Sequence, residues 1–337
     1  MSAESAGWVA GKRDAITDIP GIRVGQWTHR RAATGCTVVL CETAACVAVD
    51  VRGGAPGTRE TDLLAGPNLV RSCHAVLLTG GSAFGLAAAD GVMKWLAERE
   101  IGFQTSTRKV PIVSAAVIYD LAIGRADLTP DAAAGYFAAD HATGGKVAQG
   151  SVGAGTGATV AKMLGVEGAL KGGVGSASLV GPRGIVVGAI VVNNAGGSLF
   201  DPETGGLVAG PRGESGAMFG LAESVARRTE RMDALLEHTT LVCVATNAIV
   251  EHAALQRVTY LAHDGMARVI HPAHTLGDGD VAFAISMGQV EIQPQDVMSV
   301  GILAGKAVEI ALLRSVRRAG TLAGIPSVAD WQNEPRA

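Results

Sequence analysis

The sequence predicts an α+β fold in which two stacked β-sheets are covered by helices, an αββα arrangement. Strand-like runs and helical segments are mixed along the whole chain without regular βα alternation, and no segment repeats at a fixed period. Hydrophobic residues make up 48% of the 337 residues, which is enough to bury a large core. Aromatic residues are only 4% and glycines number 46, so we expect small core side chains that let the layers approach closely.

Four strands and three helices are expected in the first 141 residues. Apolar and β-branched runs bounded by glycine or polar residues predict strands at residues 37–42, 45–51, 74–79 and 111–118. Apolar residues at three- and four-residue spacing predict helices over residues 60–71 and 82–99. A third helix is expected over residues 131–141, with Thr129 as its cap and Pro130 at its first position.

The second half of the chain begins with a glycine-rich region. Residues 144–216 carry few charges and short apolar pairs, which predicts strands joined by tight turns. A charged helix, a strand, a helix, a strand and a closing helix are then expected in this order, at residues 214–237, 239–246, 250–263, 281–286 and 295–318. Residues 1–324 are therefore expected to form a single domain, followed by an irregular tail at residues 325–337.

The charge balance and the cysteines exclude several classes of function. With 28 basic and 31 acidic residues the net charge is −3, which gives no electrostatic support for binding nucleic acid or an anionic membrane. No apolar run approaches the ~20 residues of a membrane span, and residues 1–14 lack the apolar stretch of a signal peptide, so we expect a cytoplasmic protein. The five cysteines have no CxxC spacing and are expected to be reduced core thiols.

Glycine-rich and histidine-containing segments give little support for a cofactor or a metal. Residues 150–157 resemble a dinucleotide-binding loop, but no well-formed strand precedes them and no acidic residue follows at the required distance, so tight backbone packing explains them better. His271 and His274 are split by Pro272 and lack a metal-binding motif. Ser82 occupies a strand-to-helix turn that a helix cap explains equally well. We expect neither a cofactor nor a metal.

Two short segments in the last hundred residues could carry chemistry. Thr239 and Thr240 open a β-branched run, where a strand would also favour threonine. Asp278 and Asp280 stand two residues apart, just before an apolar strand. Such a pair of carboxylates can orient a nucleophile or hold a proton, and it can also be a plain turn or half of a calcium loop. The residues by themselves leave these alternatives open.

Four further segments identify a family. They read ITDIPGIRVG, RGGAPGTRE, LTGGSAFGL and VATN, at residues 16–25, 52–60, 78–86 and 244–247. With them the chain resembles the self-cleaving L-aminopeptidase/D-amino-acid esterase family, and within it most closely the 6-aminohexanoate-oligomer endo-hydrolases, from about residue 16 to residue 318. The resemblance implies a fold of the N-terminal-nucleophile type and a homo-oligomer, with a tetramer expected.

The resemblance also implies a set of site residues. The family cuts its own chain, here between His238 and Thr239, which would give chains of 238 and 99 residues with Thr239 as the new N-terminal nucleophile. His238 departs from the family, whose members usually carry Asn or Gly at this position. The other family positions map onto Tyr119, Lys171, Asn194, Asp278 and Asp280, with Asn193 as the alternative to Asn194.

The roles that the resemblance implies agree with simple acid–base chemistry. A threonine hydroxyl needs a base, and the freed α-amino group, with a reference pKa near 8, supplies one on the same residue. The Tyr119 hydroxyl and the Asn194 amide are expected to donate to the oxyanion. Lys171 is expected to pair with Asp278 or Asp280 and to hold the network in register.

These roles lead to an expected activity. The chain should be a self-processing amidohydrolase or aminopeptidase that cleaves small linear amides, peptides or ω-amino-acid oligomers through an acyl-threonine intermediate. Two alternatives remain open: an acyltransferase that uses the same acyl-threonine, and a non-catalytic assembly protein that retains the fold.

Overall fold

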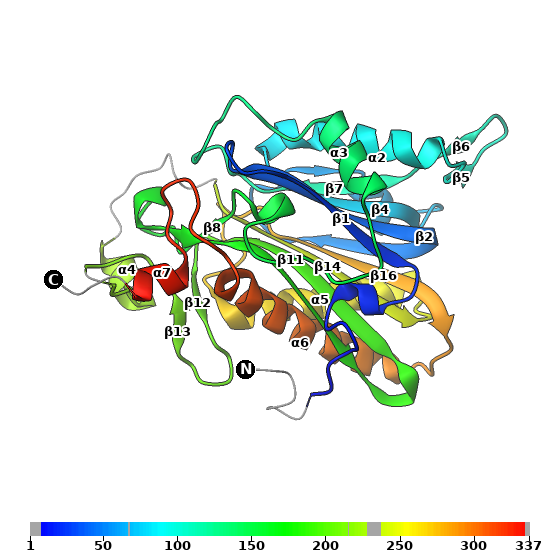
Figure 1. Ribbon diagram of the computed structural model, residues 1–337. Helices are drawn as coiled ribbons and strands as arrows, with labels where there is room; N and C mark the ends of the chain where they lie inside the picture. Colours follow the sequence, from blue (N-terminus) through cyan, green and yellow to red (C-terminus); the bar gives the residue numbers. More distant parts are fainter. Residues whose placement is uncertain (1–7, 67, 215, 228–236, 334–337) are drawn as a thin grey trace.

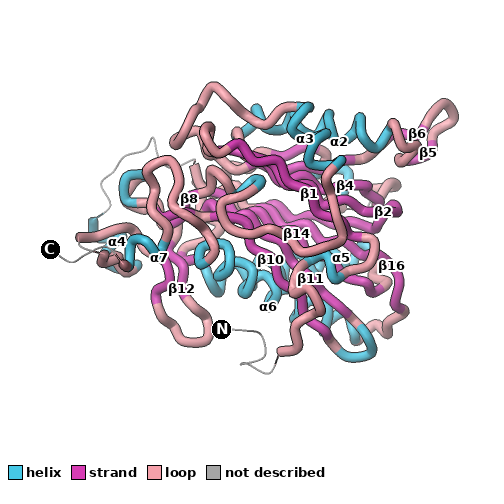
Figure 2. The backbone as a smooth tube through the Cα atoms, in the orientation of Figure 1, coloured by secondary structure: helices cyan, strands magenta, loops and turns pink. Residues whose placement is uncertain are grey.

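Four layers, in the order helix, sheet, sheet, helix, make up the protein (Figure 1). The computed structural model describes residues 8–66, 68–214, 216–227 and 237–333. Within these residues, hydrogen bonds join nine strands in the order β10-β11-β14-β16-β2-β4-β7-β3, with β1 paired to β2. Figure 2 shows the strands gathered in the middle of the molecule with helices on both outer sides. The predicted αββα class is confirmed.

The long strand β2 (Thr34–Val51) belongs to both sheet layers. Its first half pairs with β1 (Ile22–His29) and its second half pairs with β16 (Val281–Val290). Strand β4 (Ser72–Thr79) pairs with residues of both halves of β2. We expected two separate strands at residues 37–42 and 45–51, and this was wrong. Neither glycine nor proline interrupts the run, so the backbone stays extended and only the register against β4 shifts, between Leu40 and Ala45.

Two pairs of helices cover the outer faces of the sheets. The layer of β1, the first half of β2, β4, β7 (Val113–Val117) and β3 (Thr58–Arg59) is covered by α2 (Ala88–Ala97) and α3 (Ala132–Asp140). The layer of β16, β14 (Thr239–Ala248), β11 (Val186–Asn194) and β10 (Gly173–Val180) is covered by α5 (His252–Val269) and α6 (Asp296–Arg317). Each helix pair therefore seals one apolar face of its sheet.

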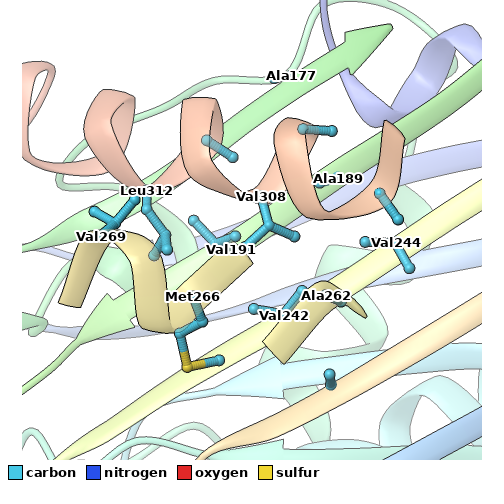
Figure 3. Close-up of a cluster of buried hydrophobic side chains, with 14 of the residues drawn as sticks. Ala177, Ala189, Val191, Val242, Val244, Ala262, Met266, Val269, Val308 and Leu312 are labelled. Carbon is cyan, nitrogen blue, oxygen red and sulfur yellow. The ribbon is translucent and has the colours of Figure 1, made fainter. Parts of the chain in front are cut away.

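Alternation along the strands divides the core into three apolar layers. On β14, Val242 and Val244 face α5 and α6, where they pack with Met266 and Val308 (Figure 3). Leu241 and its alternate neighbours point the other way, into the layer between the two sheets. Because both faces of β14 are buried, its sequence reads as a continuous apolar run rather than as an alternating one.

Several predicted elements differ from the structure at their ends. The helix expected over residues 60–71 is only α1 (Thr61–Leu64), since Gly66 adopts a φ of +112° that leaves the helical path. Asp131, not Thr129, caps α3 by accepting the N–H of Ala134 at 2.9 Å. Of the charged helix expected over residues 214–237, the structure describes α4 (Leu221–Arg227), and residues 228–236 lie outside the described part.

Short strands and one short helix complete the architecture. They are β5 (Phe103–Gln104), β6 (Lys109–Val110), β8 (Thr159–Val160), β9 (Leu170–Lys171), β12 (Ser198–Phe200), β13 (Leu207–Ala209), β15 (Ile270–His271) and α7 (Val328–Gln332). The tail was expected to be irregular, but α7 forms because the Ser327 hydroxyl caps it at the N–H of Asp330. Among the described helices, none is long and apolar enough to cross a bilayer.

All five cysteines are unpaired, and four of them are fully buried. Burial raises the pKa of the Cys36 thiol to about 12 and also raises that of Cys41. These side chains are therefore neutral apolar groups of the core, as the sequence predicted.

Close packing of main chain against main chain explains the glycine-rich region. A Cβ on Gly155 would lie 2.3 Å from the nitrogen of Val174. A Cβ on Gly175 in β10 would lie 1.8 Å from the carbonyl oxygen of Ala311 in α6, so β10 and α6 can approach this closely only with glycine. The glycines of residues 150–157 thus serve packing, as expected.

Gly175→Ala should lower the free energy of unfolding by about 1–3 kcal/mol, the usual range for overpacking a dense core. The reason is that α6 must shift to make room for the new methyl group. Urea unfolding followed by circular dichroism measures this change. Gly320→Ala is the matched control, because nothing lies within 4 Å of a Cβ at that position; equal stability of the two variants would contradict the packing explanation.

Candidate active site

The candidate site lies at the edge of the sheet where β14 begins. β14 and β16 run parallel, so the segments that precede both strands meet at this edge. β11 runs antiparallel to β14 and ends here, with Asn194 as the register partner of Thr239. Three segments far apart in sequence therefore bring together Thr239, Asn194 and the turn of residues 277–280.

Thr239 is the first residue of β14, and only 5% of its surface is exposed. Its Oγ1 donates to the carbonyl oxygen of His238 at 2.5 Å. The same oxygen accepts the N–H of Gly279 at 2.8 Å. A Cβ on Gly279 would lie 2.8 Å from Thr239 Oγ1, so glycine keeps the space beside the hydroxyl open. The peptide group between His238 and Thr239 is thus contacted by a hydroxyl and by an N–H donor.

The Asp280 carboxylate is buried and anchors the start of β14. Its Oδ1 accepts the N–H of Thr240 at 2.6 Å. Its Oδ2 accepts the main-chain N–H of His274 at 3.0 Å and lies 2.8 Å from His274 Nδ1. Asp278 accepts the N–H of Thr275 at 2.6 Å, and burial, together with the neighbouring Asp280 charge, raises its pKa. The two carboxylates therefore differ in environment, as a pair with separate tasks requires.

Asn194, the last residue of β11, is fully buried. Its Nδ2 donates to the main-chain oxygens of Tyr119 at 3.1 Å and Glu237 at 3.2 Å, and its Oδ1 accepts the N–H of Thr159 at 2.9 Å. Asn193 points to the opposite face of β11, where its Nδ2 donates to Ser315 of α6 at 3.1 Å. Strand alternation therefore brings Asn194, and not Asn193, next to Thr239.

Lys162, which the sequence analysis missed, is the lysine that contacts these residues. Its Nζ donates to Asn194 Oδ1 at 3.0 Å and to the Glu237 carbonyl oxygen at 2.9 Å. Burial lowers its pKa to about 7, against the opposing effects of Glu237 and Asp278. Its sequence signal is weak: Lys162 stands five residues after the glycine-rich segment of residues 150–157, which packing explains, and outside the Lys-Gly-Gly segment that begins at Lys171.

Lys171 does not make the expected contact with Asp278 or Asp280. Its Nζ instead donates to the main-chain oxygens of Thr156, at 2.9 Å, and Ala158. The side chain is completely buried, and burial lowers its pKa to about 7. Lys171 therefore holds the loop before β8 through two main-chain oxygens, and these bonds occupy the amine that was expected to pair with Asp278 or Asp280.

Tyr119 is half-buried, and desolvation raises the pKa of its hydroxyl, with Glu237 adding to the effect. Its described contact with Asn194 is through the main-chain oxygen rather than the hydroxyl. The next residue, Asp120, is buried and accepts Thr34 Oγ1 and the N–H of Gly81, each at 2.7 Å. Burial raises the pKa of Asp120 to about 6. Asp120 therefore ties the segment after β7, which carries Tyr119, to the turn after β4 and to the start of β2.

The His238 ring lies against Gly196, where a Cβ would come within 2.5 Å of the ring carbon Cδ2. Within the described residues, no group of three or more His, Cys, Asp or Glu side chains could hold a metal ion. These residues supply a hydroxyl, N–H donors at a carbonyl oxygen, and buried groups with shifted pKa values, which are the groups that acyl chemistry uses.

Comparisons with known proteins agree with this assessment. Residues 14–328 match the family described as Peptidase family S58. An uncharacterized aminopeptidase of Mycobacterium tuberculosis is 43% identical, with 94% of this chain and 97% of the relative covered. A 6-aminohexanoate-oligomer endohydrolase of Kocuria sp. is 31% identical, with 90% of this chain and 84% of the relative covered.

Solved structures share the fold. The L-aminopeptidase D-Ala-esterase/amidase of Ochrobactrum anthropi, described as a variant of the Ntn hydrolase fold, superimposes with a TM-score of 0.73 at 21% identity, covering 96% of this chain and 92% of that one. A β-aminopeptidase of Burkholderia sp. gives a TM-score of 0.70 at 21% identity, covering 98% of both chains. The predicted N-terminal-nucleophile-type fold is confirmed.

The buried lysines predict how stability depends on pH. Lys171 loses its proton near pH 7 in the folded protein, whereas an unfolded chain keeps this proton to about pH 10. Unfolding therefore takes up a proton between pH 7 and 8.5, and the free energy of unfolding should rise with pH in this range. Lys171→Met should reduce this slope by about 1 kcal/mol per pH unit.

Urea unfolding at pH 7.0, 7.75 and 8.5 measures the slope, with Thr239→Ala as the common background so that the chain stays in one piece. Lys94→Met, which removes an exposed lysine of α2, is the control and should leave the slope unchanged. An unchanged slope in Lys171→Met would mean that the buried amine keeps its proton.

Proposed function

Since the chain belongs to peptidase family S58, we propose that it is an amide-bond hydrolase that cuts itself before Thr239 and then uses this residue as its nucleophile. The observation that carries the proposal is the contact of Thr239 Oγ1 and of the Gly279 N–H with one carbonyl oxygen, that of His238. A nucleophile beside an acyl group and a donor at its oxygen are the two requirements of acyl transfer.

The self-cleavage step follows from this contact. Thr239 Oγ1 attacks the carbonyl carbon of His238, and the negative charge develops on the oxygen that the Gly279 N–H contacts at 2.8 Å, within the usual range of oxyanion donors. The C–N bond breaks, the nitrogen of Thr239 takes up the proton that Oγ1 gives up, and the His238 acyl group is left as an ester on Oγ1. Water then hydrolyses this ester, which frees a carboxylate on His238 and an α-amino group on Thr239.

The hydrolytic cycle uses the new amino group. With a reference pKa near 8, the α-amine of Thr239 accepts the proton of its own hydroxyl as Oγ1 attacks the substrate carbonyl. The leaving amine takes this proton, and water releases the acyl group from Oγ1. This cycle needs no histidine base, because the amine and the hydroxyl belong to the same residue.

Asn194 and Lys162 supply further donors. In the uncut chain, Asn194 Nδ2 and Lys162 Nζ donate to the carbonyl oxygen of Glu237, one residue before the scissile bond. Withdrawal of this segment after cleavage would release both donors for the oxyanion of a substrate. Lys162 thus takes the place that the sequence analysis gave to Lys171, and its pKa near 7 keeps part of the population neutral at the site.

The substrate is proposed to be a small linear amide or peptide, or an ω-amino-acid oligomer. The names of the two kinds of relatives, aminopeptidase and 6-aminohexanoate-oligomer endohydrolase, support this range. Product analysis with a linear 6-aminohexanoate oligomer and with alanine p-nitroanilide, each with and without an added amine, separates hydrolysis from acyl transfer to that amine.

Thr239→Ala should abolish both self-cleavage and hydrolysis, because it removes the oxygen that attacks in each step. The wild-type protein should show chains of about 24 and 10 kDa with Thr239 as a new N-terminus. Mass spectrometry of the purified protein and the rate of amide hydrolysis measure the two effects.

Thr240→Ala is the matched control, since Thr240 is the next residue of the same buried strand. It should keep both activities. Two results would contradict the assignment of Thr239 as the nucleophile: an uncut wild-type protein that still hydrolyses amides, or a Thr240→Ala variant that is inactive.

Asn194→Ala should lower kcat by about 10²–10³-fold, the usual effect of removing one oxyanion donor. Self-cleavage should be slower but still detectable, because each chain needs only one turnover and the Gly279 N–H remains. Steady-state kinetics and a time course of chain cleavage measure the two rates. Asn193→Ala, which alters the opposite face of β11, should leave kcat unchanged; equal losses in both variants would indicate a structural effect.

A further inference from the structure

His274 makes an unusual set of contacts next to the nucleophile. Its main-chain N–H and its ring nitrogen Nδ1 both face Asp280 Oδ2, at 3.0 and 2.8 Å. The residue has a φ of +58°, a left-handed conformation that few non-glycine residues adopt. This strained backbone is what lets one residue hold the carboxylate at two points.

A second histidine fixes the ring of His274. The His263 ring meets it edge-on, with 4.7 Å between the ring centroids. His263 is fully buried on α5, and its Nε2 lies 3.1 Å from the main-chain oxygen of Asp50. Burial lowers the pKa of His263 to about 4, so it is neutral near pH 7 and places no positive charge beside His274. The orientation of the His274 ring is therefore set from two sides.

Asp280 connects His274 to the residue after Thr239. Its other oxygen, Oδ1, accepts the N–H of Thr240 at 2.6 Å. This N–H lies in the same planar peptide group as the Cα of Thr239. Holding the plane fixes the position of the Thr239 Cα, from which its nitrogen and Oγ1 extend. His274, Asp280 and the Thr239–Thr240 peptide group thus form one chain of contacts.

The nearby Asp278 makes this support necessary. Asp278 and Asp280 repel each other, as the raised pKa of Asp278 indicates, and His274 acts in the opposite direction on Asp278. Loss of the His274 ring would leave the main-chain N–H of His274 as the remaining described donor to Oδ2, so the Asp280 carboxylate would be held less firmly on the Thr240 N–H.

We propose that His274 is a positioning residue: its Nδ1–H holds Asp280 on the Thr240 N–H and so aligns the Thr239 hydroxyl for attack. The proposal rests on Thr239 being the nucleophile. His274 itself does not touch the reacting atoms, so it should affect kcat and leave KM little changed.

Three substitutions at one position test the proposal. His274→Asn places an amide N–H where Nδ1–H stood, His274→Asp has the same size but no such donor, and His274→Gly removes the side chain. All three residue types adopt a positive φ more readily than most others, and Asn and Asp do so to a similar extent. His252→Ala is the control: it removes another buried histidine, whose ring bonds the main-chain oxygen of Leu64, far from Asp280 in sequence.

The expected result is a kcat close to wild type for His274→Asn and a loss of about 10²-fold for His274→Asp and His274→Gly, the effect of a misplacement of about 1 Å. Self-cleavage, followed by mass spectrometry, should slow in the same order. His252→Ala should keep the wild-type kcat. Thermal melting identifies any variant that fails to fold, and the Asn and Asp variants alone then decide the question.

Equal kcat values for the Asn and Asp variants, or a wild-type kcat in His274→Gly, would overturn the positioning role. The parallel Thr239→Ala variant separates this outcome from a failure of the proposed function. If Thr239→Ala is inactive while His274→Gly is fully active, only the role of His274 is wrong. If Thr239→Ala is active, Thr239 is not the nucleophile, and the proposed role of His274 is then wrong as well.

Discussion

The parallel pairing of β14 with β16 is the constraint on which the rest of the site depends. Parallel strands begin at the same edge of a sheet, so the hydroxyl of Thr239 and the turn of residues 277–280 meet although about forty residues of chain separate them. α5 makes the crossover between these strands, and its burial against the sheet holds both strand starts in place. The N–H of Gly279 reaches the His238 oxygen only in this register.

The close packing of layers with small side chains buries the charged groups of the site and shifts their pKa values. Two lysines and three aspartates lie among apolar residues with little exposed surface, so each must find its partners in the main chain or in one another. Lys162 and Lys171 do so through carbonyl oxygens, while Asp120 and Asp280 do so through N–H groups. The shifted pKa values at this edge are a consequence of the same packing that stabilises the fold.

The sequence predicted the layers and strand β14 well, because apolar runs and glycine breaks are local signals. It could not place residues whose position depends on register. Lys171 stands beside a conspicuous glycine motif, yet its amine bonds the main-chain oxygens of the loop before β8. The less conspicuous Lys162 reaches Asn194 instead. Asn193 and Asn194 differ only in the face of β11 that they occupy, which one residue of register decides. The continuous β2 was missed because its change of partners leaves no mark in the residues.

The strand order has a consequence for the independence of the two segments on either side of Thr239. β14 and β16 follow this residue, yet β11 and β2, which flank them in the sheet, precede it. The last 99 residues thus supply the middle of a sheet whose neighbours come from the first 238. A break before Thr239 would leave two polypeptides interleaved as one cooperative unit, and neither would expose fewer than two unpaired strand edges if they were drawn apart. Such interleaving would keep the arrangement of the strands unchanged after a cut at this position.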